Sequence, residues 1–331
     1  MKDLQIQYTR ILADYLENQT ERNLYIGQNF IRQLIQKNVT PEDVIHIHKI
    51  SMQEILPDMN PEVMNGFDFL LEMMVHFGLT VREHHSLLEQ QEEIRVEMEV
   101  ATKIQQMLLK TSVPKTTKLD IGMVSIPIRK MNGDYVHFLH NDDSHLSVAV
   151  TDVVGKGVPA ALCMSMVKYG LDTLEYANGN PSYVLEVLNR IIERSVDDSM
   201  FVSMFFGRYD LNEEIFSFGS AGHEPALHYI ASEDRFETLD SSGLLLGIMA
   251  DVKYKQKEVK LSKGDFLVMM TDGVTEIRKQ DDHITQQLIQ SLLRKYKDLK
   301  AQDICDSLYN DLEELHEYGF EDDFTVVIFK K

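Results

Sequence analysis

The chain has 331 residues, more than one domain usually contains, which predicts two domains that are each long enough to bury a core. Its 33 Lys and Arg residues against 53 Asp and Glu residues leave a formal charge of -20, which disfavours a nucleic-acid partner and an anionic membrane surface. With only two cysteines, Cys163 and Cys305, no run approaching ~18 apolar residues and no secretory signal, the protein is expected to be cytoplasmic, without disulfide bonds and without a membrane partner.

The first part of the chain, up to Lys110, has few glycines, and its apolar residues recur with helical spacing. Thr40-Pro41 and Asn60-Pro61 each place a capping side chain before a proline, and acidic residues follow in the next turn. Such sequences are typical of helix starts. We therefore predict an all-α bundle of roughly four helices over residues 1–81.

The next stretch, residues 82–113, is predicted to be a linking helix, because neither glycine nor proline occurs from Leu79 to Lys110. Seven positions in it follow alternating steps of four and three, as in a coiled-coil seam: Leu87, Gln91, Ile94, Met98, Ala101, Gln105 and Leu108. Gln91 and Gln105 would weaken such a seam and could fix its register. One helix packed on its own domain fits this short run equally well.

After Pro114 the sequence changes to short β-rich runs punctuated by glycine. We predict strands at Asp120–Ile126, Tyr135–Leu139, Leu146–Thr151, Met200–Tyr209, Ile215–Ser220, Phe266–Met270 and Phe324–Phe329. Helices are predicted at Ala160–Tyr176, at Pro181–Val196 and as a pair within Thr285–Leu315. Strands with segregated helices indicate an α+β sandwich over residues 114–331.

Four aspartates lie where an apolar run meets a loop in this second part: Asp134, Asp152, Asp272 and Asp322. Three of them have a glycine beside or shortly after them, which lets backbone approach a ligand. An Asp-Gly pair alone usually marks a turn, but four such positions together are improbable by chance. Carboxylates held at rigid strand ends predict a site for hard cations that take oxygen ligands.

Two divalent cations that share a carboxylate can activate water and clamp the oxygens of a displacement at phosphorus. Carboxylate and water ligands suit Mn²⁺ or Mg²⁺, and the absence of any His-x-x-x-His or Cys-x-x-Cys pair in the sequence argues against zinc. The sequence thus favours metal-assisted hydrolysis of a phosphoester.

Six motifs, in this order, resemble the SpoIIE-type branch of the PPM metal-dependent protein phosphatases: Gly133-Asp134, Asp152-Val153-Val154-Gly155-Lys156-Gly157, Ser220-Ala221-Gly222-His223-Glu224-Pro225, Gly243-Leu244-Leu245-Leu246-Gly247, Thr271-Asp272-Gly273-Val274 and Asp322-Asp323-Phe324-Thr325. The resemblance implies a PPM-type β-sandwich flanked by helices over residues 114–331. The helical leader further resembles that of the stress-response phosphoserine phosphatases in this branch, where it serves dimerisation and partner binding.

The resemblance also implies roles for individual residues. Asp152 would bridge two Mn²⁺ or Mg²⁺ ions, Asp272 and Asp322 would complete one ion, and the carbonyl of Val153 would serve the other. Asp134 would bind an ion directly or through water. Asp323 would not bind an ion itself but would contact and orient the residues that do. In the family mechanism, water activated by the ions attacks phosphorus without a phosphoenzyme. His137 and His223 have a pKa suited to proton transfer, but lone histidines near strands are more often structural, and we leave both out of the catalytic set.

The function that follows is removal of phosphate from serine or threonine on a small regulatory phosphoprotein. The resemblance implies an anti-anti-sigma-factor-like substrate in a stress-response pathway, a homodimer, and activation by an RsbT-like switch protein at the leader or the linking helix. A catalytically silent signalling scaffold and a two-metal phosphodiesterase acting on nucleotides are the alternatives. The presence of all four aspartates disfavours the scaffold, and the charge of -20 disfavours the phosphodiesterase.

Overall fold

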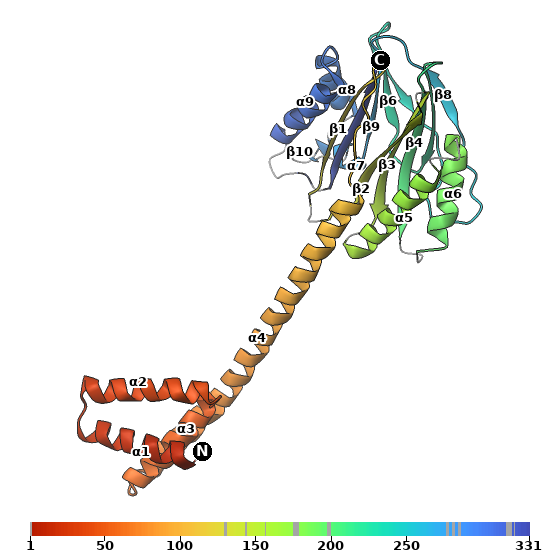
Figure 1. Ribbon diagram of the computed structural model, residues 1–331. Coiled ribbons are helices and arrows are strands. Elements are labelled where there is room, and N and C mark those ends of the chain that lie inside the picture. Colours follow the sequence, from red (N-terminus) through yellow and green to blue (C-terminus); the bar gives the residue numbers. More distant parts are fainter. Residues whose placement is uncertain are drawn as a thin grey trace. The chain divides into compact units, whose positions relative to one another are not determined.

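The computed structural model describes residues 2–128, 131–142, 144–155, 157–174, 179–196, 200–275, 278–279, 282–283, 286–315, 320 and 322–331 (Figure 1). Lys156 of the second motif and the predicted helix ends Tyr176 and Thr285 lie outside the described residues. The chain divides into two compact units, residues 1–96 and residues 97–331. None of the described helices combines the length and the apolar character that a bilayer span requires.

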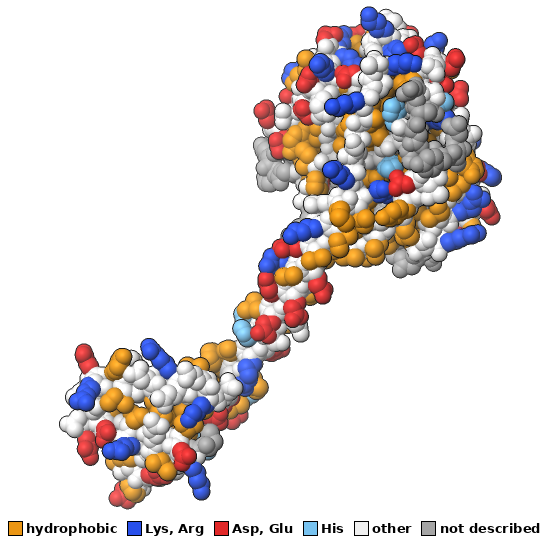
Figure 2. Space-filling view, in the orientation of Figure 1, with side chains coloured by type: hydrophobic (Ala, Val, Ile, Leu, Met, Phe, Trp, Pro, Cys, Tyr) orange, Lys and Arg blue, Asp and Glu red, His pale blue; other side chains and the backbone are white. Residues whose placement is uncertain are grey.

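The first unit is all helical. It contains α1 (Lys2–Glu17), α2 (Glu21–Gln36), α3 (Pro41–Ile55) and the first part of α4 (Pro61–Leu108). Its core is small, since Leu4, Phe30 and Leu34 form the buried cluster. Several large apolar side chains of the unit remain exposed, among them Tyr25 (61%) and Ile35 (65%) on α2, and Figure 2 shows hydrophobic side chains at the surface of this unit.

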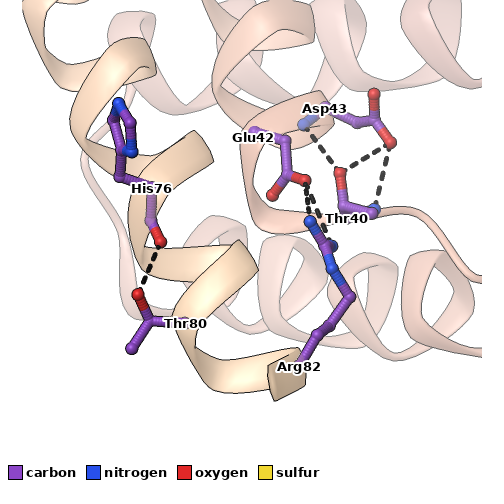
Figure 3. Close-up of polar contacts among 6 residues, drawn as sticks. All are labelled: Thr40, Glu42, Asp43, His76, Thr80 and Arg82. Atoms are coloured by element: carbon purple, nitrogen blue, oxygen red, sulfur yellow. Dashed lines mark hydrogen bonds and ion pairs between the residues drawn. The ribbon is translucent and has the colours of Figure 1, made fainter. Parts of the chain in front are cut away.

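The start of α3 and its contact with α4 are set by polar side chains (Figure 3). The Thr40 hydroxyl accepts a hydrogen bond from the Asp43 backbone N–H at 3.3 Å, and the Asp43 carboxylate accepts one from the Thr40 N–H at 3.1 Å. This capping box confirms the helix start predicted at Pro41. Arg82 of α4 pairs with Glu42 of α3 at 3.3 Å, which adds a polar contact between these two helices.

Helix α4 runs without interruption from the bundle through the predicted linking region. The predicted boundary between residues 81 and 82 falls inside this helix, so the boundaries of the leader and the linker stay predictions. Gln105, one of the predicted seam positions, is buried and hydrogen-bonded to the backbone of Asn132, and the coiled-coil seam stays a prediction.

The second unit is a sandwich of two five-stranded sheets. One sheet has the order β1 (Asp120–Ile126), β12 (Phe324–Lys330), β9 (Phe266–Met270), β6 (Ala226–Ile230) and β7 (Arg235–Leu239). The other has the order β2 (Asp134–Asp142), β3 (His145–Val154), β4 (Phe201–Asp210), β5 (Ile215–Ala221) and β8 (Lys257–Lys260). A short ribbon pairs β10 (Arg278–Lys279) with β11 (Asp282–His283). All seven predicted strands are present, and the α+β sandwich is confirmed.

Helices cover both outer faces of the sandwich (Figure 1). Apolar side chains from the two inner faces form the central core, with Phe205 and Phe216 from one sheet and Phe329 from the other. The helices α5 (Val158–Leu174) and α6 (Pro181–Glu193) pack on the β2–β8 sheet. On the β1–β7 sheet lie α8 (Gln286–Lys295) and α9 (Ala301–Glu314). This four-layer arrangement leaves the strand ends free to present polar groups.

Candidate metal centre

Two of the predicted aspartates lie opposite each other on neighbouring strands. Asp134 is the first residue of β2, and Asp152 stands near the end of β3; the antiparallel register pairs the two directly. The Val153 N–H donates to the Gly133 carbonyl at 3.3 Å, which fixes the loop before β2 against the end of β3. Because facing residues on antiparallel strands have close side chains, these two carboxyl groups belong to one region.

The other two aspartates come from the second sheet. The register pairs Met270 of β9 with Val326 of β12, and the Thr271 N–H donates to the Thr325 carbonyl at 3.1 Å. The end of β9 and the start of β12 therefore meet at one edge. There β9 leads into the short helix α7 (Asp272–Thr275), which begins at Asp272, while Asp322 lies just before β12. The antiparallel pairing thus joins two motifs that are about 50 residues apart in the chain.

A cavity of about 510 Å³ brings three of the four predicted aspartates together. Its acidic lining residues are Asp152, Asp272, Asp322 and Asp323, and its described lining residues include no Lys or Arg. Asp134 lines a smaller adjacent cavity of about 190 Å³ instead. Its buried carboxylate accepts a hydrogen bond from the Thr271 hydroxyl at 2.7 Å. The structure thus places Asp134 behind the cavity that the other three line.

Acidic side chains gather among the described residues that line the larger cavity. Burial raises the pKa of Asp152 to about 7, and the negative charges of Asp272 and Asp322 act in the same direction. Burial also raises the pKa of Asp134, although its hydrogen bond from Thr271 opposes the shift. Since a divalent cation among these groups would relieve their mutual repulsion, the electrostatics of the cavity fit a metal site.

Oxygen atoms converge around Gly133. A methyl group at this glycine would lie 3.4 Å from Asp152 Oδ1, 3.4 Å from Asp323 Oδ2 and 3.9 Å from the Val153 carbonyl oxygen. The Asp323 carboxylate accepts hydrogen bonds from the backbone N–H groups of Gly133 at 2.6 Å and Ile128 at 2.8 Å. Asp323 thereby holds the backbone of Ile128 and of Gly133 beside the carboxylates, a position that agrees with a supporting role.

The donor set suits a hard cation. Among the described residues, no group of three or more His, Cys, Asp or Glu side chains is arranged to hold one ion directly. Mg²⁺ usually keeps several waters, so carboxylates around a site can hold it through water as well as directly. Mn²⁺ accepts the same oxygen ligands. Carboxylate and carbonyl oxygens around one cavity therefore fit Mg²⁺ or Mn²⁺ with water completing the coordination.

The two histidines considered in the sequence lie outside this lining. His223 is buried, its Nδ1 lies 2.8 Å from the Ser203 hydroxyl, and burial lowers its pKa to about 4. His137 contacts the Tyr135 hydroxyl at 2.7 Å, and burial lowers its pKa to about 4 as well. Both rings are therefore neutral near pH 7 and bonded within the fold.

The sequence did not predict the structural role of two polar residues at the site. Thr271 is fully buried and orients Asp134; its place directly before Asp272 in the motif was the available signal. Gln105 of α4 donates a hydrogen bond to the loop before Asp134. One indication of this role was present in the sequence, a polar side chain among the mainly apolar positions of the helical repeat. The sequence could not say which partner each would find.

Comparison with known families assigns both parts of the chain. Residues 142–331 match the family described as stage II sporulation protein E (SpoIIE). Residues 6–80 match the N-terminal domain of the phosphoserine phosphatase RsbU. The chain is also 40% identical over 325 residues to the phosphoserine phosphatase RsbU of Bacillus subtilis (strain 168), covering 98% of this chain and 97% of that protein.

Solved structures share the fold of the second unit at low sequence identity. The SiaA-PP2C domain of Pseudomonas aeruginosa superimposes with a TM-score of 0.63 at 18% identity, covering 73% of this chain and 98% of that domain. RsbX in complex with magnesium gives a TM-score of 0.51 at 18% identity, with 66% of this chain and 98% of RsbX covered. Both likenesses support the PP2C-type sandwich.

Proposed function

This chain belongs to the SpoIIE family of PPM-type serine phosphatases and is an RsbU-like phosphoserine phosphatase, and from that premise we propose that its substrate is phosphoserine on a small regulatory protein of the anti-anti-sigma-factor type. The observation that carries the proposal is the cavity that Asp152, Asp272 and Asp322 line together. A pathway that controls a stress-response sigma factor is the setting we infer from the likeness to RsbU.

We assign the cavity to two Mn²⁺ or Mg²⁺ ions. Asp152, Asp272, Asp322 and the Val153 carbonyl would hold these ions, directly or through water, and Asp152 would be the ligand common to both. Asp134, which faces Thr271 and the smaller cavity, acts through water. This set is supported by the raised pKa of Asp152, which reflects burial and the neighbouring negative charges, and by the oxygens that surround Gly133. The magnesium in the RsbX complex is in keeping with the assignment.

In this assignment the side chains hold the ions and orient the ligand groups, and the ions activate water. When bound, Mn²⁺ or Mg²⁺ provides a Lewis acid that lowers the pKa of water and neutralises charge at phosphorus. Asp323 holds the loop at Gly133 through two backbone hydrogen bonds. The Thr271 hydroxyl keeps the Asp134 carboxylate in one orientation. Because such groups are fixed before substrate arrives, little reorganisation is needed in the reaction.

A substrate panel tests the proposed activity. We expect the full chain to release phosphate from phosphoserine peptides and phosphoserine proteins with Mn²⁺, more slowly from a small phosphoester, and not at all with chelator. The same preparation is assayed on a cyclic dinucleotide. Preferential cleavage of the dinucleotide would replace our proposal by the phosphodiesterase alternative, and turnover that survives chelation would remove the role of the ions.

We further propose that the first unit forms a homodimer and receives an RsbT-like activating partner, with α4 carrying the signal. The support is its small core beside many large exposed apolar side chains, such as Tyr25 and Ile35, because an excess of exposed apolar surface is typical of protein interfaces. The match of residues 6–80 to the RsbU N-terminal domain is consistent with a regulatory unit.

Light scattering on the full chain tests the dimer. We expect the mass of a dimer, and we expect Ile35→Glu to weaken dimerisation about tenfold or more, since it places a charge in an apolar interface. Gln36→Glu is the matched control, because it adds the same charge at the next position, where the side chain is also exposed. A monomer at every concentration, with and without a partner, would end this proposal.

A further inference from the structure

One side chain of α4 pairs with both backbone polar groups of a single residue in the loop before Asp134. Gln105 Nε2 donates to the Asn132 carbonyl at 2.8 Å, and the Asn132 N–H donates to Gln105 Oε1 at 3.2 Å. The Gln105 side chain is buried, with 5% of the residue exposed. A neutral amide has both a donor and an acceptor, so glutamine can satisfy both backbone groups at once.

The residue held in this way directly precedes Gly133 and Asp134, which we call the metal loop. Asn132 is followed by Gly133, around which the oxygens of Asp152, Asp323 and Val153 gather. The Asn132 side chain also accepts a hydrogen bond from the Asp134 N–H at 2.9 Å. Every displacement of Asn132 therefore moves the backbone that carries Gly133 and Asp134.

The last part of α4 and the residues after it make two further contacts near the site. Met98 is one of the residues that line the carboxylate cavity. Thr111, just after α4, donates to the Val136 carbonyl at 2.6 Å, which ties the chain to β2 two residues beyond Asp134. The Thr111 bond anchors the same segment but does not involve Asn132 or Gly133. Removing the Thr111 bond therefore shows what loss of anchoring alone does to cation binding, for comparison with removing the Gln105 bonds.

We propose that Gln105 is a positioning residue that couples the end of α4 to the metal loop, so that cation binding in the cavity and docking of residues 97–111 stabilise each other. The inference rests on the metal centre proposed above. Coupling of this kind is reciprocal, because two events that favour the same arrangement must favour each other equally. Loss of the Gln105 amide weakens cation binding, and a bound cation holds the end of α4 more tightly.

Calorimetric titration of the metal-free full chain with Mn²⁺ measures the first consequence. We expect Gln105→Leu, which keeps the size and removes both hydrogen bonds, to weaken Mn²⁺ binding about 10–100-fold, as loss of a group supporting metal ligands does. Gln105→Glu retains an acceptor for the Asn132 N–H but not the donor, and we expect an intermediate loss. Gln106→Leu, at the exposed neighbouring position, and Thr111→Val should bind Mn²⁺ as the wild type does.

Hydrogen–deuterium exchange measures the reciprocal consequence, and its comparison of the wild type with and without Mn²⁺ does not depend on a variant that folds. In the wild-type chain, Mn²⁺ should slow exchange of backbone amides in residues 97–111, and in Gln105→Leu this protection should largely disappear. Unchanged exchange in the wild type on Mn²⁺ binding would overturn the proposal, as would equal loss of affinity in Gln105→Leu and Thr111→Val. If the wild type binds no Mn²⁺, the metal centre itself fails and the coupling with it.

Discussion

Replacing Asp152 by asparagine should lower the turnover of a phosphoserine substrate by about 10²–10⁴-fold or more, as loss of a central catalytic element does. The change keeps the shape of the side chain and removes the negative charge of the carboxylate that we propose as a ligand of both ions. Burial and neighbouring negative charge raise the pKa of Asp152 to about 7 in the folded chain. The stability of the metal-free protein should therefore fall as the pH rises from the ordinary aspartate pKa towards 7, with the full cost above about 7, and we expect Asp152→Asn to raise the melting temperature near neutral pH without metal.

Steady-state kinetics with Mn²⁺ and thermal melting with chelator check this pair of effects. Asp210→Asn is the control, because Asp210 ends β4 and contacts His145 at 3.4 Å outside the lining of the carboxylate cavity. That variant should keep turnover and gain no stability. An Asp152→Asn enzyme that retains more than about a hundredth of the wild-type rate would contradict a shared ligand.

The change Gly273→Ala should cost both stability and activity. Its added methyl group would lie 2.1 Å from the Asp323 carbonyl oxygen and 3.2 Å from the Asp322 carbonyl carbon. Both contacts are with backbone, which cannot rotate away, so the start of β12 must shift. Overpacking of this kind costs about 1–3 kcal/mol, and displacement of a catalytic group by about 1 Å can cost roughly 10²-fold in rate.

Denaturant unfolding and phosphopeptide turnover measure the two consequences of Gly273→Ala. Gly66→Ala is the matched control, because Gly66 lies in α4 and a methyl group there would meet nothing within 4 Å. Removing a helical glycine should instead stabilise the protein by about 0.5–1 kcal/mol. If Gly273→Ala is as stable and active as the wild type, α7 and the segment before β12 are not packed as the structure has them.

The sandwich could be predicted where local signals were strong. Apolar runs bounded by glycine identified seven strands, and the capping residue with proline at Thr40-Pro41 placed the start of α3. The strands β6, β7 and β8 and the two-residue strands β10 and β11 were missed, whereas the equally short β9 was found because all five of its residues are apolar. The sequence of β8, Lys-Glu-Val-Lys, has a single apolar residue, and its pairing with β5 is decided by tertiary contact rather than by its own pattern.

The site was predictable as a set of aspartates but not as a geometry. The four positions follow from strand ends, and three of them line one cavity. The position of Asp134 in the neighbouring cavity depends on Thr271, which arrives from the other sheet. The pairing of Gln105 with Asn132 likewise depends on where α4 ends. Such contacts join distant segments, and no local pattern encodes them.

Anomalous diffraction from crystals of the full chain soaked in Mn²⁺ would test the central claim most directly. We expect two manganese peaks in the cavity lined by Asp152, Asp272 and Asp322, with the Asp152 carboxylate contacting both. No peak in that cavity at saturating Mn²⁺, or manganese bound only to other residues, would contradict the account.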